Sequence, residues 1–182
     1  MKKLTKIVAA ASFAVATLFA SNVVKAQSRT AANDWRLGIG VEAGVPTGNA
    51  HDGSNFALGG TARLQYGAAQ NVALTLTSGF YNFFGKEIGN TNFKTESLGV
   101  IPVKAGIKAY TTGGFYFSGE VGAGFETKSR YLNGDKDTKL ILSPGVGYSW
   151  SNVDLGVRYE NFSGQSNNYG MVAARLAYGF KL

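Results

Sequence analysis

The residues of this sequence that could support chemistry are few and lie close together. His51 is the only histidine of the chain, and Asp52 and Ser54 follow it in the stretch GNAHDGSN. Histidine, carboxylate and serine form hydrolytic triads, but a triad acts only where rigid elements hold its members in place. A glycine- and asparagine-rich loop does not provide that rigidity. We therefore interpret His51 as a solvated loop residue and predict no catalytic site.

The same histidine is the centre of the only metal site that the sequence suggests. Asp52 adjoins it, Glu87 and Asp135 could add carboxylates, and the chain has no cysteine. A single histidine with scattered carboxylates supplies too few ligands to define a metal centre. We expect neither a metal nor a cofactor.

Glycines at 38, 40 and 44 in the stretch WRLGIGVEAGVPTG (35–48) suggest a phosphate-binding loop. A dinucleotide-binding fingerprint requires a strand, a tight turn and a helix in that order. Here the glycines fall on one face of a strict alternation, and Pro46-Thr47-Gly48 is expected to end the segment as a turn. The stretch therefore predicts a β-strand and no nucleotide site.

The same alternation recurs seven more times along the chain. Successive side chains of a strand point to opposite faces, so each segment has one apolar face and one face of small or charged residues. Abundant glycine (25) and scarce proline (3) also suit a sheet better than a helical bundle. The predicted strands are 35–45, 56–66, 72–84, 98–110, 115–126, 140–150, 153–162 and 171–182.

The connections between these strands alternate between long, polar segments and short turns. Alternating long loops and tight turns are typical of transmembrane β-barrels. The sequence thus predicts an all-β fold, an eight-stranded antiparallel up-and-down transmembrane β-barrel with both termini on one side. The connections are 46–55, 67–71, 85–97, 111–114, 127–139, 151–152 and 163–170.

A soluble, lipocalin-like barrel would show the same alternation with its apolar face turned inward. Two features favour the membrane. The other face is mostly Gly, Ser, Thr and Ala, whereas a water-exposed surface carries roughly 25–35 % charged residues. Aromatic residues also gather at both ends of the apolar face, as in the two interfacial girdles of membrane barrels. The predicted girdle beside the short turns is Trp35, Tyr66, Tyr110, Phe115, Trp150, Tyr178 and Phe180, and the one toward the long loops is Phe56, Phe80, Phe83, Phe84, Phe125, Tyr159 and Phe162.

The first 26 residues have the pattern of a cleaved signal peptide. A basic start precedes an apolar stretch, and Val24 and Ala26 occupy the −3 and −1 positions of a cleavage site. We expect a short N-terminal segment at 27–34 and the barrel at 35–182. Four lysines belong to the leader, so the formal charge falls from +7 to +3 without it, and no basic cluster predicts a nucleic-acid partner.

Residues 97–126, SLGVIPVKAGIKAYTTGGFYFSGEVGAGFE, resemble the signature region of the small outer-membrane β-barrel families related to OmpA and OmpX. A strand with "IP" and Lys is followed there by a tight turn and an aromatic, glycine-rich strand. The resemblance implies a bacterial outer-membrane location, with outer-membrane lipid and the barrel-insertion machinery as partners. That machinery reads a terminal aromatic; here Leu182 ends the chain and Phe180 lies on the same face.

The predicted inward face collects charges of both signs. Unpaired charges in a poorly hydrated interior cost several kcal/mol, so we expect complementary pairs that fill the lumen. The alternative is a small ion path lined by the same residues. These are Arg36, Glu42, Arg63, Lys104, Lys108, Glu120, Glu126, Asp154, Arg158, Glu160 and Arg175.

Three functions remain open at this point. The first is a structural or surface-binding barrel without enzymatic activity, which would bind a surface ligand through loops 85–97, 127–139 and 163–170. The second is a small passive channel. The third is a lipid-modifying enzyme, because outer-membrane deacylases and acyltransferases are small barrels with Ser, His and a carboxylate.

Overall fold

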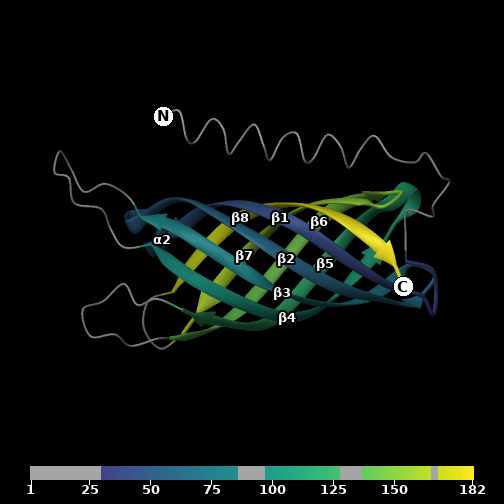
Figure 1. Cartoon of the computed structure of the whole chain (residues 1–182), viewed down its shortest axis with the longest axis horizontal. Helices are drawn as coiled ribbons and strands as arrows, with labels where there is room; N and C mark the ends of the chain where they lie inside the picture. Colours follow the sequence, from purple (N-terminus) through teal and green to yellow (C-terminus); the bar gives the residue numbers. More distant parts are fainter. Residues whose placement is uncertain (1–29, 86–96, 128–136, 165–167) are drawn as a thin grey trace.

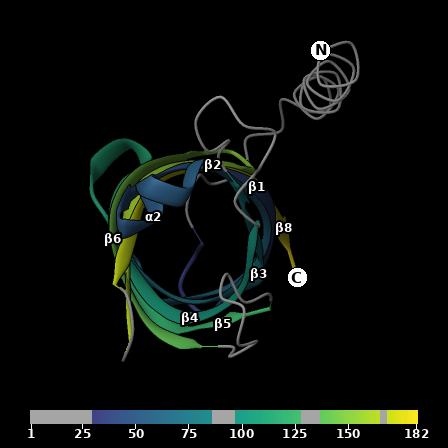
Figure 2. The same ribbon diagram turned by 90° about the vertical axis from the view of Figure 1, so that its left-hand side faces the viewer.

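Eight antiparallel strands form one closed barrel in the computed structural model, which describes residues 30–85, 97–127, 137–164 and 168–182 (Figure 1). Each strand pairs with the next, and the last pairs with the first to close the barrel, as the view along its axis shows (Figure 2). The predicted fold class is confirmed. The strands are β1 (Trp35–Gly48), β2 (Ser54–Ala69), β3 (Val72–Gly85), β4 (Leu98–Tyr110), β5 (Phe115–Glu126), β6 (Thr138–Trp150), β7 (Val153–Ser163) and β8 (Tyr169–Lys181).

The prediction of a turn at Pro46–Gly48 is wrong. These residues continue β1, because they pair with the start of β8, where Pro46 faces Met171 and Gly48 faces Tyr169. The connection to β2 is then only the short helix α2 (Asn49–Gly53). Among the described residues no helix is both long and apolar enough to cross a membrane.

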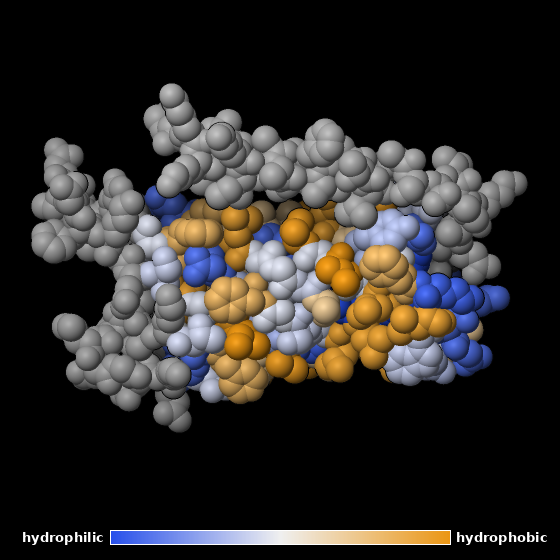
Figure 3. Space-filling model, in the orientation of Figure 1, coloured by the Kyte–Doolittle hydropathy of each residue, from blue (hydrophilic) through white to orange (hydrophobic). Residues whose placement is uncertain are grey.

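The apolar faces of the strands point outward. In β3, Leu74 and Leu76 are 47 % and 52 % exposed, while Ala73, Thr75 and Thr77 between and beside them are buried in the barrel. Exposed apolar side chains are therefore spread over the wall between the two ends of the barrel, and on the face drawn in Figure 3 they lie among residues of intermediate hydropathy. Closure leaves no unpaired strand edge, so such an exterior is stable in hydrocarbon.

Aromatic side chains lie outside at both ends of this apolar wall. Near the short turns, the Trp35 and Tyr66 rings lie 4.8 Å apart and the Tyr178 and Phe180 rings 5.0 Å apart, with Phe115 and Trp150 also exposed. Near the loops the exposed aromatic residues are Phe56, Phe80, Phe84, Phe125 and Tyr159.

Three predicted girdle residues point into the barrel instead. Tyr110 is buried against Tyr116, with ring centroids 5.5 Å apart, and Phe83 and Phe162 are fully buried. Each follows an outward position by an odd number of residues: Ala109 precedes Tyr110, Phe80 precedes Phe83 and Tyr159 precedes Phe162. Alternation therefore turns all three inward, and their assignment to the girdles is corrected here.

The two tryptophans of the chain provide a test of the barrel's orientation in lipid. Trp35 and Trp150 are 46 % and 37 % exposed at the turn end of the wall. In vesicles we expect lipids brominated near the headgroup to quench their fluorescence more strongly than lipids brominated at the end of the acyl chain. Absence of quenching by any brominated lipid would contradict an outward apolar face.

Candidate functional site

The barrel lumen holds a buried network of ion pairs, which is the only dense set of charged side chains in the described part of the chain. Glu160 of β7 is fully buried and accepts hydrogen bonds from Lys104 of β4 and from Nε of Arg158, the latter at 2.6 Å. Arg158 also forms an ion pair with Glu42 of β1. The Tyr81 hydroxyl lies 3.3 Å from the Glu160 carboxylate. Side chains of β3, β4 and β7 thus meet at one carboxylate, and Arg158 connects it to β1.

A second group adjoins the first across the lumen. Glu120 of β5 accepts hydrogen bonds from Arg63 at 3.0 Å and from the Thr77 hydroxyl at 2.7 Å. The Lys104 ammonium lies 3.5 Å from the other Glu120 oxygen, so this lysine joins the two groups. All these side chains are almost completely withdrawn from solvent. Low dielectric strengthens such pairs, provided that each charge keeps its partner.

Asp154 of β7 forms the third group, nearer the short turns. It pairs with Lys108 and accepts hydrogen bonds from the Tyr116 hydroxyl at 3.0 Å and the Ser149 hydroxyl at 2.7 Å. Arg175 of β8 lies 3.6 Å from Asp154 and 3.4 Å from Glu42. It therefore links this group to the first.

Two predicted lumen charges lie outside these groups. Arg36 sits near the start of β1, where its guanidinium donates to the Ser151 carbonyl at 2.8 Å and the Asn152 side-chain carbonyl at 2.7 Å. Glu126 ends β5 at the opposite mouth and accepts a hydrogen bond from the Tyr169 hydroxyl at 3.1 Å. The structure thus brings the other nine together, which are Glu42, Arg63, Lys104, Lys108, Glu120, Asp154, Arg158, Glu160 and Arg175.

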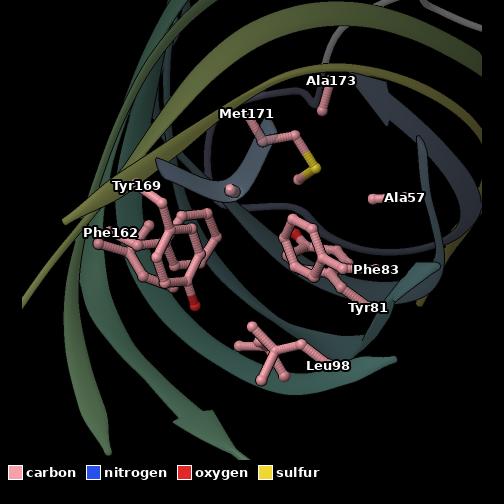
Figure 4. Close-up of a cluster of buried hydrophobic side chains, with 11 residues drawn as sticks. Ala57, Tyr81, Phe83, Leu98, Phe162, Tyr169, Met171 and Ala173 are labelled. Carbon is pink, nitrogen blue, oxygen red and sulfur yellow. The ribbon is translucent and has the colours of Figure 1, made fainter. Parts of the chain in front are cut away.

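The loop end of the lumen is filled by an apolar cluster that the sequence analysis missed. Phe83 packs edge-to-face against Phe162 and Tyr169, at 6.1 Å and 5.9 Å between ring centroids, and the last two rings stack at 4.8 Å (Figure 4). Met171 reaches into the same space. Ala50 of α2 belongs to the cluster, and the helix lies over one side of this mouth (Figure 2). The sequence does contain a feature that could have predicted this cluster. Large apolar residues occupy inward positions of strands whose other inward residues are small or polar.

The opposite end of the lumen is covered by the chain that precedes β1. Thr30 is buried and accepts a hydrogen bond from Gln65, which also donates to the Tyr110 hydroxyl at 3.1 Å. Asn33 donates its backbone N–H to the Gly67 carbonyl at 2.8 Å. Residues 30–34 are therefore attached to the turn end of β2.

Several inward glycines make room for the lumen tyrosines and Met171. A Cβ at Gly147 would lie 2.3 Å from the Tyr116 hydroxyl, and one at Gly44 would lie 2.5 Å from the Met171 sulfur. At these distances a Cβ could be accommodated only if the Tyr116 or Met171 side chain moved. Gly40 and Gly44 thus face closely packed parts of the interior, in a strand and not in a phosphate loop.

His51 lies on α2 and is exposed. Glu87 and Asp135 are outside the described residues, as are the leader 1–26 and most of loops 85–97 and 127–139. Among the described side chains no group of three His, Asp or Glu residues could hold a metal ion.

No family model and no curated protein matches the sequence. Solved structures do match. The Ail attachment invasion locus protein of Yersinia pestis superposes with a TM-score of 0.59 at 13 % identity, over 82 % of this chain and 99 % of that one. It has also been solved in complex with the heparin analogue sucrose octasulfate. The N-terminal β-barrel domain of Pseudomonas aeruginosa OprF gives 0.54 at 14 % identity, over 79 % and 97 %. Neisserial surface protein A gives 0.51 at 15 %, over 80 % and 97 %. The resemblance predicted from residues 97–126 is confirmed at the level of the fold.

Proposed function

We propose that this chain, a bacterial outer-membrane β-barrel of the OmpA- and OmpX-like fold, is a non-enzymatic protein that acts through its loops or as a structural element of the membrane. The filled lumen carries the proposal. Apolar side chains occupy its loop end, ion pairs its middle, and residues 30–34 cover its turn end. An eight-stranded barrel is only just wide enough for side chains, so little space remains for a solute.

This proposal predicts that the barrel does not conduct ions. Refolded protein, inserted into planar lipid bilayers, should give no steady single-channel openings, because the Phe83 cluster and the Glu160 ion pairs lie in series along the axis. A heat-dependent shift in SDS gel mobility of the same sample establishes that the barrel is folded. Steady openings by folded protein would overturn the proposal in favour of a small passive channel.

A loop-mediated role directs attention to the loop sequence 127–139. Its segment 128–136 carries Lys128, Arg130 and Lys136 against Asp135, an excess of two positive charges. Cationic side chains suit an acidic surface ligand. The sulfated ligand of Ail, a protein of the same fold, makes a sulfated polysaccharide a suitable first test ligand.

Exchange of 128–136 for a short Gly-Ser linker tests this loop. The flanking residues are already joined, since the Glu126 N–H donates to the Asp137 carbonyl at 3.1 Å. We expect binding of the protein to heparin resin to fall while the heat-dependent mobility shift is kept. The variant Lys128→Gln/Arg130→Gln/Lys136→Gln, which removes all three positive charges of the segment, should lose binding in the same way. Unchanged retention of both variants would exclude this loop as the binding element.

The absence of enzymatic activity is tested through the histidine. His51→Ala should leave the lipid A composition of the producing cells unchanged, because His51 is exposed on a short helix. A change in acylation on this substitution alone would support the lipid-modifying enzyme instead.

A further inference from the structure

A small cavity remains in the lumen between the Asp154 group and the turn end. Its volume is about 30 Å³, which is the space of one or two water molecules or a small ion. Gln65 and Tyr110 line it on the side where Thr30 binds, so residues 30–34 lie between the cavity and the turn-end mouth.

The charges around this cavity are unbalanced. Its walls include four cations, Arg36, Arg63, Lys108 and Arg175, and a single carboxylate, that of Asp154. Glu120 neutralises Arg63 from outside the cavity wall. Lys108 and Arg175 then share Asp154. The other carboxylate near Arg175, that of Glu42 at 3.4 Å, lies outside the cavity wall and is also paired with Arg158. The hydrogen bonds of Arg36 go to neutral oxygens, those of Ser151 and Asn152.

The two terminal nitrogens of the Arg175 guanidinium have no close hydrogen-bond acceptor among the described residues. Its side chain is only 2 % exposed, yet Nη1 lies 3.6 Å from Asp154 and Nη2 lies 3.5 Å from the Gly38 carbonyl. Only Nε has a short partner, the Thr61 hydroxyl at 3.0 Å. Buried guanidinium groups normally donate to close acceptors, and a buried charge without a matching one is costly. An additional acceptor in the cavity would satisfy both requirements.

We propose that this cavity binds one small monovalent inorganic anion of the size of chloride, held by the Arg175 guanidinium and attracted by Lys108 and Arg36. The anion enters from the turn end, past residues 30–34, because the apolar cluster closes the other mouth. The small cavity volume favours a small anion over a larger one such as sulfate. The site is independent of any ligand at the loops and of any conduction, since it is a dead end.

Gly38 offers a way to fill the site from within the chain. A Cβ at Gly38 would lie 3.7 Å from Nη2 of Arg175 and no closer than 3.8 Å to the backbone, so a side chain fits there. The carboxylate of Gly38→Asp would take the place of the anion beside the guanidinium. Gly38→Asn has the same size and no charge, which makes it the matched control.

The test is the line width of the chloride NMR signal in the presence of the refolded, micelle-bound barrel at constant ionic strength. We expect excess broadening with wild type, displaced by bromide and not by sulfate. Gly38→Asp should weaken chloride binding about tenfold or more, whereas Gly38→Asn should keep most of the broadening. Arg36→Gln, which changes a half-buried residue at the barrel rim, should weaken binding as well and serves if Gly38→Asp fails to fold. Absence of broadening with wild type, or equal broadening with Gly38→Asp, would overturn the proposal.

Discussion

Glu160→Gln is expected to lower the free energy of unfolding of the barrel by about 3–5 kcal/mol, the usual loss when one partner of a buried ion pair is removed. Glutamine keeps the shape of the side chain but removes the negative charge that Lys104 and Arg158 share. Lys104 is completely buried, and Arg158 nearly so, so neither can turn to water. Lys104 would then share Glu120 with Arg63, and Arg158 would share Glu42 with Arg175. The loss therefore comes from this excess of buried positive charge and not from a change in packing.

Urea unfolding of the protein refolded into lipid vesicles measures this loss. Glu126→Gln is the matched control, because Glu126 lies at the loop-end mouth and is partly exposed, and it should cost about 1 kcal/mol or less. The double variant Lys104→Met/Glu160→Gln should recover part of the stability, since it removes one of the two cations that lose a carboxylate partner. A loss below about 1 kcal/mol for Glu160→Gln would mean that water screens the network, and it would reopen the ion path.

The alternation of residue types predicted most of the barrel because it is a local property. The polar Thr75 between Leu74 and Leu76 is enough to predict that the two leucines lie on the opposite face from it, whichever strands β3 pairs with. The end of β1 could not be predicted in this way. The composition of Pro46–Gly48 predicts a turn. These residues form a strand because β8, more than a hundred residues later in the chain, pairs with them.

The sequence predicted which charged residues lie in the lumen, but it did not predict which of them form ion pairs. Parity along the strands turns Glu160 and Lys104 inward, but their contact depends on the register of the four strands β4 to β7. The same parity assigns Phe83, Phe162 and Tyr110 to the interior. The sequence analysis nevertheless assigned them to the girdles, because they are aromatic and lie near strand ends. An aromatic residue at such a position can equally well pack inside the end of the lumen.

Phe83→Ala is expected to have the second large effect, a loss of about 3–5 kcal/mol in the free energy of unfolding. Phe83 is completely buried, and both Phe162 and Tyr169 pack against its ring. Alanine leaves a cavity inside a rigid cylinder of hydrogen-bonded strands. The wall cannot collapse into that cavity, so the lost contacts are not replaced and the cost lies near the top of the range for such substitutions.

The neighbouring residue makes the comparison decisive, because Phe84 differs from Phe83 only in the side of the wall on which it lies. Phe84 is 44 % exposed on the outside, so Phe84→Ala loses only part of a contact with lipid and should cost about 1 kcal/mol. The same urea titration in vesicles measures both variants. If Phe84→Ala were the more damaging of the two, β3 would be turned by one residue and every side chain assigned to its lumen face would lie in the membrane, because a one-residue slip reverses both faces. A larger loss for Phe83→Ala than for Phe84→Ala would thus support both the apolar cluster at the loop end of the lumen and the orientation of β3.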